Sequence, residues 1–254
     1  MTFIDPARPW TIITGDCMAV LKDMANGTVD HVIADPPYDE KTHRCLQDAF
    51  DNSRASPYAR GTRPNTIATE FDALTLDGLA ALVGEQGRVA LRWRINFCTL
   101  EMLGAYAAAS GDAWVRAGFW HAADRAPQFS GDRPAQAGDG VAIAHREGRK
   151  RWNGGGHRAF WSCPVEHVDR VHPTQKPIRL VARMVEQFTD LGELVLDTHC
   201  GSGTTGVACL RLGRRFLGIE VDPAMAETAR ERLRAEERMV GVVSSRAGQG
   251  ALFG

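Results

Sequence analysis

The sequence lacks several features that would place it in a narrow class of proteins. Its six cysteines include no CxxC pair, so we expect neither a zinc site nor a disulfide framework, but reduced thiols in a cytoplasm. No apolar stretch approaches the roughly 20 residues of a membrane span. The first residues, MTFIDPARPW, lack the basic and apolar regions of a secretory signal. These absences predict a cytoplasmic globular protein.

An excess of charge of one sign is also missing, because the formal net charge is −1. The basic residues are nevertheless unevenly placed. Five lie between residues 41 and 63, and five between residues 146 and 158, in stretches rich in Gly, Pro, Asn or Ser. Both stretches are predicted to be exposed loops. A solvated loop is the simpler interpretation of each, and a surface for nucleic-acid phosphates is the alternative.

Apolar runs alternate with helical patterns along most of the chain. Strands are predicted at 10–14, 29–34, 87–93, 113–122, 140–145, 194–198 and 215–220, and helices at 18–24, 75–84, 97–109, 177–187, 205–212 and 223–238. This order predicts one α/β domain over residues 1–254 with a seven-stranded mixed sheet. Residues 113–122 and 140–145, joined without a helix, are predicted to pair antiparallel. A disordered tail is expected over 241–254.

The segment VLDTHCGSGTTGVA is typical of a nucleotide-binding turn. An apolar strand ends at Asp197, Gly201 and Gly203 permit close approach of a ligand, and a helix from Thr204 offers free amides. Glu220 ends the next strand, where an acid can bind both hydroxyls of a ribose. The spacing departs from GxGxxG and no P-loop lysine follows, which favours an adenosine without phosphates, such as S-adenosylmethionine. A glycine-capped junction of strand and helix is the purely structural alternative.

Four motifs together resemble the amino-methyltransferases that act on exocyclic nitrogens of DNA bases. They are DPPY (35–38), HPTQKP (172–177), DTHCGSGTT (197–205) and Glu220. DPPY precedes the glycine turn, an order similar to that of the beta group of this family. The resemblance implies a circularly permuted Rossmann-like methyltransferase fold with helices on both faces of the sheet. In such a fold the strand that ends near Asp16 completes the sheet beside the last strand.

DPPY directly follows a predicted buried strand, at the sheet edge where ligands of α/β proteins bind. Pro36 and Pro37 have no amide hydrogen, so this loop offers only hydrogen-bond acceptors. Asp35 and the Pro36 carbonyl are expected to accept the two N–H groups of a base amine, and Tyr38 to stack on a flipped base. Asp35, Pro36, Pro37 and Tyr38 form the predicted catalytic set.

By resemblance, Thr174 and Lys176 lie against the methionine part of the cofactor, with Lys176 balancing its carboxylate. The family commonly has Asp-Pro-Phe before its glycines, whereas this chain has Asp197, Thr198 and His199. His199 is interpreted as a more polar wall of the pocket. The predicted cofactor residues are Asp16, Thr174, Lys176, Asp197, His199, Gly201, Gly203, Thr204 and Glu220.

The resemblance also places inserted target-recognition loops in this chain, which we assign to residues 39–74 and 146–171. Both are expected to open from the active edge of the sheet, where duplex phosphates run. The segment 125–136 either lines the same cleft or is a plain connection. The predicted DNA-binding residues are Arg149, Lys150, Arg151, Trp152, Asn153, His157 and Arg158.

These observations predict a site-specific DNA methyltransferase that moves a methyl group from S-adenosylmethionine to N6 of adenine in duplex DNA by base flipping. Adenine is favoured because Asp in the first position of DPPY is the family's usual adenine form. Methylation of cytosine N4 and a catalytically idle S-adenosylmethionine-binding DNA module are the alternatives. The expected partners are double-stranded DNA, a second copy of the chain and a restriction endonuclease, in a nucleoid-associated cytoplasmic location.

Overall fold

The computed structural model describes residues 8–38, 74–125, 134–166 and 175–250, with side chains as far as residue 240. Its strands are β1 (Trp10–Thr14), β2 (His31–Ala34), β3 (Trp93–Cys98), β4 (Trp114–His121), β5 (Gly138–His145), β6 (Phe160–Ser162), β7 (Leu194–Asp197) and β8 (Arg215–Glu220). Its helices are α1 (Cys17–Asp23), α3 (Leu76–Val89), α4 (Leu103–Ser110), the 3-10 helix η1 (Gly111–Ala113), α5 (Ile178–Phe188), α6 (Thr204–Arg211) and α7 (Pro223–Gly250).

All described strands form one mixed sheet in the order β1-β8-β7-β2-β3-β5-β4-β6. Five neighbours, β1, β8, β7, β2 and β3, run parallel, whereas β5 runs antiparallel to both β3 and β4. The first strand pairs with the last, and Thr14 lies opposite Glu220. This pairing confirms the permuted arrangement, in which the beginning of the chain completes the sheet beside its final strand.

The sheet differs from the prediction in two places. It has eight strands rather than seven, because the short edge strand β6 pairs with β4. The strand predicted at 87–93 is wrong: α3 continues to Val89, and the strand spans Trp93–Cys98. Arg94 and Asn96 of this strand are polar, and both are buried. Their side chains bond to α3, Arg94 to the Val83 carbonyl and Asn96 to Gln86.

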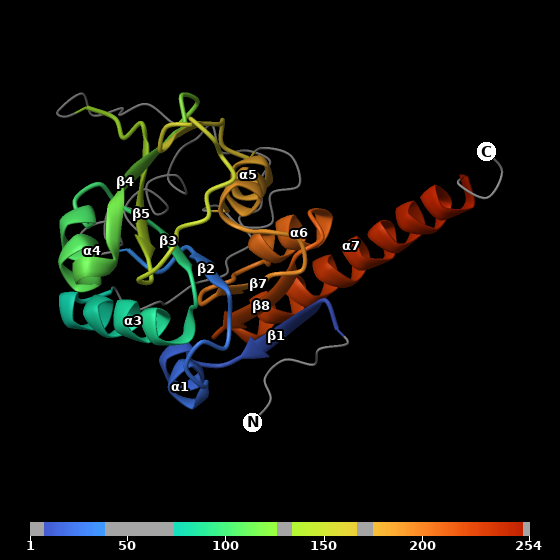
Figure 1. Ribbon diagram of the computed structural model, residues 1–254, viewed down its shortest axis with the longest axis horizontal. Coiled ribbons are helices and arrows are strands. Elements are labelled where there is room, and N and C mark those ends of the chain that lie inside the picture. Colours follow the sequence, from blue (N-terminus) through green and yellow to red (C-terminus); the bar gives the residue numbers. More distant parts are fainter. Residues whose placement is uncertain (1–7, 39–73, 126–133, 167–174, 251–254) are drawn as a thin grey trace, which may run out of the picture.

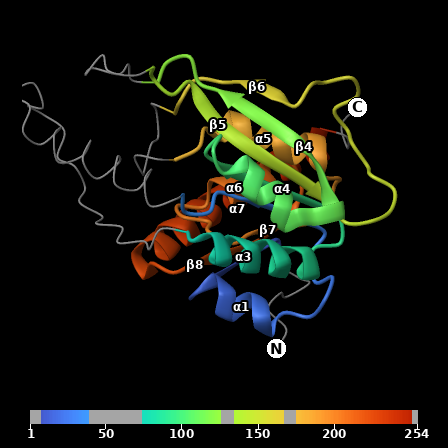
Figure 2. The same cartoon turned by 90° about the vertical axis from the view of Figure 1, so that its left-hand side faces the viewer.

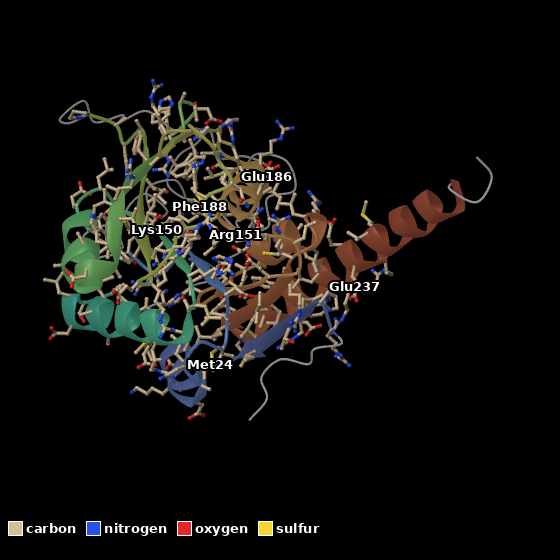
Figure 3. All side chains as sticks on the ribbon, viewed as in Figure 1. Met24, Lys150, Arg151, Glu186, Phe188 and Glu237 are labelled. Atoms are coloured by element: carbon tan, nitrogen blue, oxygen red, sulfur yellow. The ribbon has the colours of Figure 1, made fainter. Side chains whose placement is uncertain are left out.

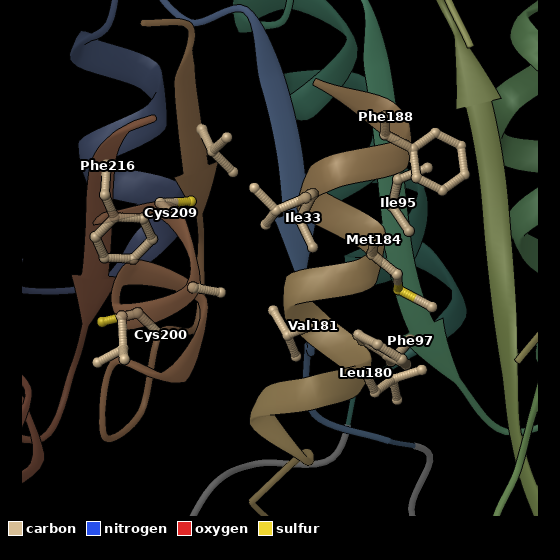
Figure 4. Packing of buried hydrophobic residues seen from close by; sticks show 14 of the residues in the cluster. Ile33, Ile95, Phe97, Leu180, Val181, Met184, Phe188, Cys200, Cys209 and Phe216 are labelled. Carbon is tan, nitrogen blue, oxygen red and sulfur yellow. The ribbon is translucent and has the colours of Figure 1, made fainter. Parts of the chain in front are cut away.

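Helices cover both faces of the sheet (Figures 1 and 2). On one face α5, α6 and α7 pack against the strands, and α1, α3 and α4 cover the other. The four apolar residues Leu180, Val181, Met184 and Phe188 recur at helical spacing along α5, and they lie against Ile33, Ile95 and Phe97 of the sheet (Figure 4). This packing fixes the start of α5, and hence Lys176, beside the end of β2.

The long helix α7 ties the two ends of the chain together. Arg230 donates to the Thr14 hydroxyl at 2.6 Å, and the Trp10 indole donates to Glu237 at 2.9 Å (Figure 3 labels Glu237). The helix continues to Gly250, past the end predicted at Arg238. β1 is therefore held between the last strand and the last helix.

Candidate active site

The predicted catalytic and cofactor residues meet at one edge of the sheet, where the parallel strands end. Asp35 follows β2, Asp197 ends β7 and Glu220 ends β8. β7 pairs with both β2 and β8, so the two segments that carry the motifs are neighbours in the sheet. Ligands of open α/β sheets bind beyond this edge. The structure thus brings DPPY beside the glycine turn, as predicted from the order of the motifs.

The Asp197 side chain holds the glycine turn through hydrogen bonds to residues on both sides of it. It is buried, and its carboxylate accepts from the Thr205 hydroxyl at 2.7 Å and from the His199 amide at 3.1 Å. Burial raises the pKa of this carboxyl to about 7. Gly201 and Gly203 both have positive φ, which lets the chain turn sharply into α6. Since α6 begins at Thr204 without a side-chain cap, its first amides face the turn.

Glu220 lies beside this turn and braces it. Its carboxylate accepts from the backbone amides of Gly201 at 2.8 Å and Asp222 at 2.9 Å, and burial raises its pKa. Asp16, at the end of the adjacent strand, instead caps α1 by accepting from the Ala19 amide at 2.8 Å. Both carboxyl groups stand where the cofactor site was predicted, and their contact with a ribose or an adenine stays a prediction.

His199 is the end of a buried chain of polar side chains. Gln86 and Asn96 bond to each other through both amides, and Gln86 also donates to the Thr198 hydroxyl at 3.3 Å. The Thr198 hydroxyl is then left to donate to His199 Nδ1, which is 2.9 Å away. This assignment puts the proton of the neutral imidazole on Nε2, 3.4 Å from the Cys17 sulfur. Burial lowers the pKa of His199 to about 4, which agrees with a neutral ring.

These contacts explain the departure from Asp-Pro-Phe. The Thr198 hydroxyl and the His199 ring are hydrogen-bonded to each other. Together they take the place of the apolar Pro-Phe pair that is common in the family. A phenylalanine at 199 would leave the Thr198 hydroxyl without this acceptor. The His199 ring therefore has a fixed orientation, with its Nε2–H facing the Cys17 sulfur, and its role as a wall of the cofactor pocket stays a prediction.

Asp35 and Tyr38 belong to a compact group of charged and polar side chains. Lys176 Nζ lies 2.6 Å from Asp35 and 2.9 Å from the Tyr38 hydroxyl. The Tyr38 hydroxyl is 3.2 Å from Asp35 and also 3.2 Å from Asp139 of β5. Asp139 in turn forms an ion pair with Arg125 at 2.7 Å and lies 3.6 Å from Lys176. Two carboxylates and two cations thus surround one phenol.

Lys176 lies deeper in the protein than a solvated lysine. Its side chain is 9% exposed, and its ammonium is 5.2 Å from the ring centres of both Tyr38 and Phe97. Trp120 adds a third ring at 6.0 Å. A cation is stabilised by such aromatic faces. Lys176 was predicted to balance the carboxylate of a cofactor, whereas in the structure it is paired with Asp35. Thr174, the other residue of that prediction, lies outside the described residues.

The environment controls the ionisation of Asp35. Burial raises the pKa of its carboxyl, the charge and hydrogen bond of Lys176 act in the opposite direction, and the charge of Asp139 raises it again. Burial, followed by the same two carboxylates, raises the pKa of Tyr38 well above its ordinary value. Tyr38 is therefore a neutral phenol that donates, and Asp35 is the acceptor whose charge depends on Lys176.

Asp139 was not predicted as a site residue, whereas Arg125 is the first residue of the segment 125–136, for which lining of the cleft was one of the two interpretations; residues 126–133 of that segment lie outside the described residues. Asp139 is 3% exposed and stands in β5 between two glycines, in the short sequence GDG. The signal that marks it is a lone acid in an otherwise apolar strand, since a buried charge requires partners. The neighbouring sequence does not identify those partners, because Tyr38 and Lys176 belong to remote segments of the chain.

The loop after β5 lies at the other edge of the sheet, which corrects the prediction that it opens from the active edge. β5 runs antiparallel to β3, so His145 pairs with Trp93, the first residue of that strand. The indole of Trp93 donates to the Arg151 carbonyl, and Trp152 packs edge-on against Phe188 at the end of α5. Figure 3 labels Lys150 and Arg151 near Phe188 and Glu186.

Several residues of this loop serve to attach it to α5. Asn153 donates from Nδ2 to the Thr189 carbonyl and to Asp190, both at 2.9 Å, and Arg151 pairs with Asp190 at 2.7 Å. The His157 ring stacks near Trp161. Arg149, Lys150 and Arg158 are exposed. Contact between this loop and DNA stays a prediction. The reason given for it, a position at the active edge, does not hold for these residues.

The other basic stretch, residues 41–63, lies outside the described residues. Its flanks are described, however: the Leu74 amide donates to the Tyr38 carbonyl at 3.2 Å. The two flanking residues therefore lie side by side at the active edge. Within the described ranges, no helix combines the length and the hydrophobicity needed to cross a membrane.

The comparisons with known proteins agree with this geometry. Residues 111–231 match a family model described as a DNA methylase of the N6/N4 type. The chain is 26% identical to the type II methyltransferase M.HinfI of Haemophilus influenzae, over 88% of this chain and 68% of that one. These matches confirm the resemblance that the four motifs predicted.

Solved structures show the same fold. The structure titled as the M1.HpyAVI–SAM complex has a TM-score of 0.63 and 22% identity, over 88% of this chain and 100% of that one. The cytosine-N4-specific PvuII DNA methyltransferase has a TM-score of 0.66 and 13% identity, over 91% of this chain and 92% of that one. At these identities the likeness establishes the fold alone, and the predicted Rossmann-like α/β class is confirmed, with eight strands in place of seven.

Proposed function

From the premise that this chain is a relative of the beta-group N6/N4 DNA amino-methyltransferases, we propose that it methylates N6 of adenine in duplex DNA with S-adenosylmethionine. One observation carries the proposal: Asp35 to Tyr38 follow β2, directly beside the strand that ends in the glycine turn. An acceptor-only loop and a nucleotide-binding turn are thus neighbours. This is the arrangement that transfer of a methyl group from cofactor to amine requires.

The residues around the turn fit a cationic cofactor better than a phosphorylated one. Asp35, Asp197 and Glu220 all have a raised pKa, and the charges of Asp35 and Glu220 contribute to that of Asp197. A pyrophosphate beside the charges of Asp35 and Glu220 would be repelled, whereas a sulfonium would be attracted. Bound S-adenosylmethionine would supply an electrophilic methyl group at this place. Glu220 is the residue proposed for its ribose, and the His199 ring would line its pocket.

The chain's own contribution is to orient the target amine and to stabilise the charge that develops on it. Asp35 accepts one N–H of the amine, and the Pro36 carbonyl is proposed to accept the other, which frees the nitrogen lone pair. Positive charge then grows on nitrogen beside a carboxylate, and this raises the rate. Lys176 must move from Asp35 far enough to admit the amine. Tyr38 is proposed to contact the ring of a flipped base.

Tritium transfer tests the proposal directly. Cofactor labelled in the methyl group is incubated with mixed duplex DNA, and the DNA is hydrolysed to nucleosides. We expect label in N6-methyladenine, and we expect Asp35→Ala to abolish transfer while cofactor binding, measured by calorimetry, persists. Label in N4-methylcytosine would replace adenine by cytosine as the target. Cofactor binding without transfer to any duplex would leave only the idle binding module.

DNA contact is proposed chiefly for residues 39–74, because the chain enters and leaves this segment at the active edge. In the insertion at 146–171, the part that follows β5 lies beside the amino ends of the parallel strands. β6 then runs parallel to β4 and brings the chain back to the active edge, where the Val165 amide donates to Asp124 at 2.9 Å. A second copy of the chain and a restriction endonuclease stay predicted partners. Neither is needed to complete the site described above.

A further inference from the structure

We propose that Asp139 is a positioning residue of the reaction: it holds the Tyr38 hydroxyl and balances the charge of Lys176, so that Asp35 keeps its acceptor geometry towards the target amine. This inference rests on the proposed methyl transfer. It adds a second carboxylate to the centre, one that belongs to none of the four motifs by which the chain is recognised.

The strand geometry directs Asp139 into the site. Residues alternate across a strand, and Asp139 lies opposite Trp120 in the pairing of β5 with β4, on the face covered by α5. Gly138 and Gly140 flank it and point to the other face. A Cβ at Gly138 would lie 1.7 Å from the Trp120 carbonyl oxygen. The glycine therefore lets β5 approach β4 closely enough to present Asp139 beside the start of α5.

The contacts of Asp139 all lead to residues of the site. Its carboxylate accepts from Tyr38 at 3.2 Å and from Arg125 at 2.7 Å, and lies 3.6 Å from Lys176. The Arg125 guanidinium is stacked over Trp120 at 5.0 Å, which anchors that cation on the same ring that faces Lys176. At 3% exposure the Asp139 charge must be compensated. Arg125 is its nearest cation, and its other two polar neighbours, Tyr38 and Lys176, are also the partners of Asp35.

The charge balance of the group explains why one carboxylate does not suffice. Asp35 and Asp139 together offset Lys176 and Arg125. Without Asp139, two cations would face a single carboxylate, and Lys176 would be drawn more tightly to Asp35. The amine would then compete with a stronger ion pair, and the positive charge developing on nitrogen would meet an excess of positive charge. Both effects lower the rate of the chemical step more than binding.

A purely structural role for Asp139 is the competing explanation, since the Arg125 ion pair ties the end of β4 to β5. The test compares Asp139→Asn with Asp139→Glu, and uses Asp112→Asn as the matched control, because Asp112 is an exposed aspartate of η1. Methyl transfer is measured from pH 5.5 to 9 with labelled cofactor, and cofactor affinity by calorimetry.

We expect Asp139→Asn to lower kcat by about 10- to 100-fold while the KM values for DNA and cofactor change by less than about twofold. The acid limb of the kcat profile should move to lower pH, because the Asp139 charge helps to raise the pKa of Asp35. Asp139→Glu should recover part of kcat, and Asp112→Asn should match the wild type. Lowered melting temperature with unchanged kcat and an unchanged acid limb would overturn the inference.

Two further measurements keep the outcome decisive. If Asp139→Asn does not fold, Asp139→Glu carries the test: a reduced kcat with unchanged KM supports the inference, and a wild-type kcat overturns it. If the wild type transfers no methyl group, the proposed function fails by itself. The inference is then judged by carboxyl-carbon NMR, with the Asp35 signal assigned by its disappearance in Asp35→Asn. The pH at the midpoint of the Asp35 titration should be lower in Asp139→Asn than in the wild type. An unchanged midpoint refutes the positioning role.

Discussion

Charged groups gather at both edges of the sheet, and the two groups differ in how they are held. At the amino edge, Glu193 accepts from His31 at 2.7 Å, from the Asp190 amide at 2.7 Å and from Arg92 at 2.5 Å. Although burial acts to raise it, these partners lower the pKa of Glu193. At the carboxyl edge, burial raises the pKa of Asp35 and of Asp197 despite their hydrogen bonds.

This contrast separates a structural cluster from a reactive one. The amino-edge acid is more stable as a carboxylate than it would be in water, so its charge strengthens the folded state. At the carboxyl edge, burial makes the charged form of Asp35 and Asp197 less stable than it would be in water. This destabilisation contributes nothing to the stability of the fold. Carboxyl groups destabilised by burial beside a specific cation are typical of functional sites. The comparison thus supports the proposal that the chemistry takes place at the carboxyl edge, while the amino edge stabilises the fold.

The largest effect is expected for Lys176→Met. Lys176 lowers the pKa of Asp35, so its removal should raise that pKa and increase the protonated fraction of Asp35 at any given pH. We expect methyl transfer at pH 7 to fall by about 100-fold and to recover partly as the pH rises. The acid limb should thus move in the direction opposite to that of Asp139→Asn. Lys22→Met, at an exposed lysine of α1, is the control and should leave the profile unchanged.

A decrease of methyl transfer in Lys176→Met that is uniform from pH 6 to 9 would contradict this account of Asp35. Lys176 would then act through cofactor binding alone, as its motif first suggested. Calorimetry separates the two cases, because removal of a side chain that binds the cofactor lowers affinity for S-adenosylmethionine at every pH.

The amino edge should respond in stability and not in activity. Glu193→Gln leaves Arg92 without its carboxylate and weakens the bond from His31, whose pKa burial lowers, so that the ring donates as a neutral imidazole. We expect the free energy of unfolding to fall by about 2–3 kcal/mol. Urea unfolding measures this change, with the exposed Glu101→Gln as the matched control. If kcat fell by more than the fraction of folded protein, the amino edge would contribute to activity as well as to stability, which would contradict this prediction.

Asp197 provides a pH-dependent effect on stability. Its pKa is about 7 in the folded chain, above its ordinary value of 3.8. The folded state therefore keeps a proton that the unfolded state loses, and its contribution to stability falls as the pH rises from about 4 to 7. Urea unfolding from pH 4.5 to 8 should show that the free energy of unfolding of the wild type falls by about 3 kcal/mol relative to Asp197→Asn. A difference independent of pH would contradict a protonated Asp197.

The sequence predicted the parts of the site that lie within single segments. DPPY after a strand, the turn from Asp197 to Thr204, and Glu220 at a strand end are local patterns, and the parallel arrangement brings their strand ends to one edge. The partners of these residues depend on long-range pairing. Lys176 meets Asp35 only because α5 packs across β2 and β3, and Asp139 meets Tyr38 only because β5 is inserted beside β3.

The misplaced loop has a related cause. The strands at 113–122 and 140–145 were predicted to be antiparallel, and this is confirmed as the pairing of β4 with β5. Their antiparallel relation does not say which of them runs with the parallel strands. The structure gives that direction to β4, so the chain leaves β5 at the amino edge and reaches Arg151 there. The composition of residues 146–158 predicts a basic, exposed loop. The edge of the sheet at which this loop lies depends on the direction of β5, which the local sequence does not determine.

The smallest effect is expected from this loop, and it tests the comparison at the level of DNA binding. Replacing Arg149, Lys150 and Arg158 together by Gln removes three exposed cations from the edge opposite Asp35. We expect duplex affinity to fall by less than about threefold, with little change in its dependence on salt. The matched variant replaces Arg54, Arg60 and Arg63, in the segment flanked by Tyr38 and Leu74. For each of these arginines that binds a phosphate, its replacement should reduce the salt slope by about 0.9. The reverse ranking of the two triple variants would place the duplex across the amino edge, and with it the target far from Asp35.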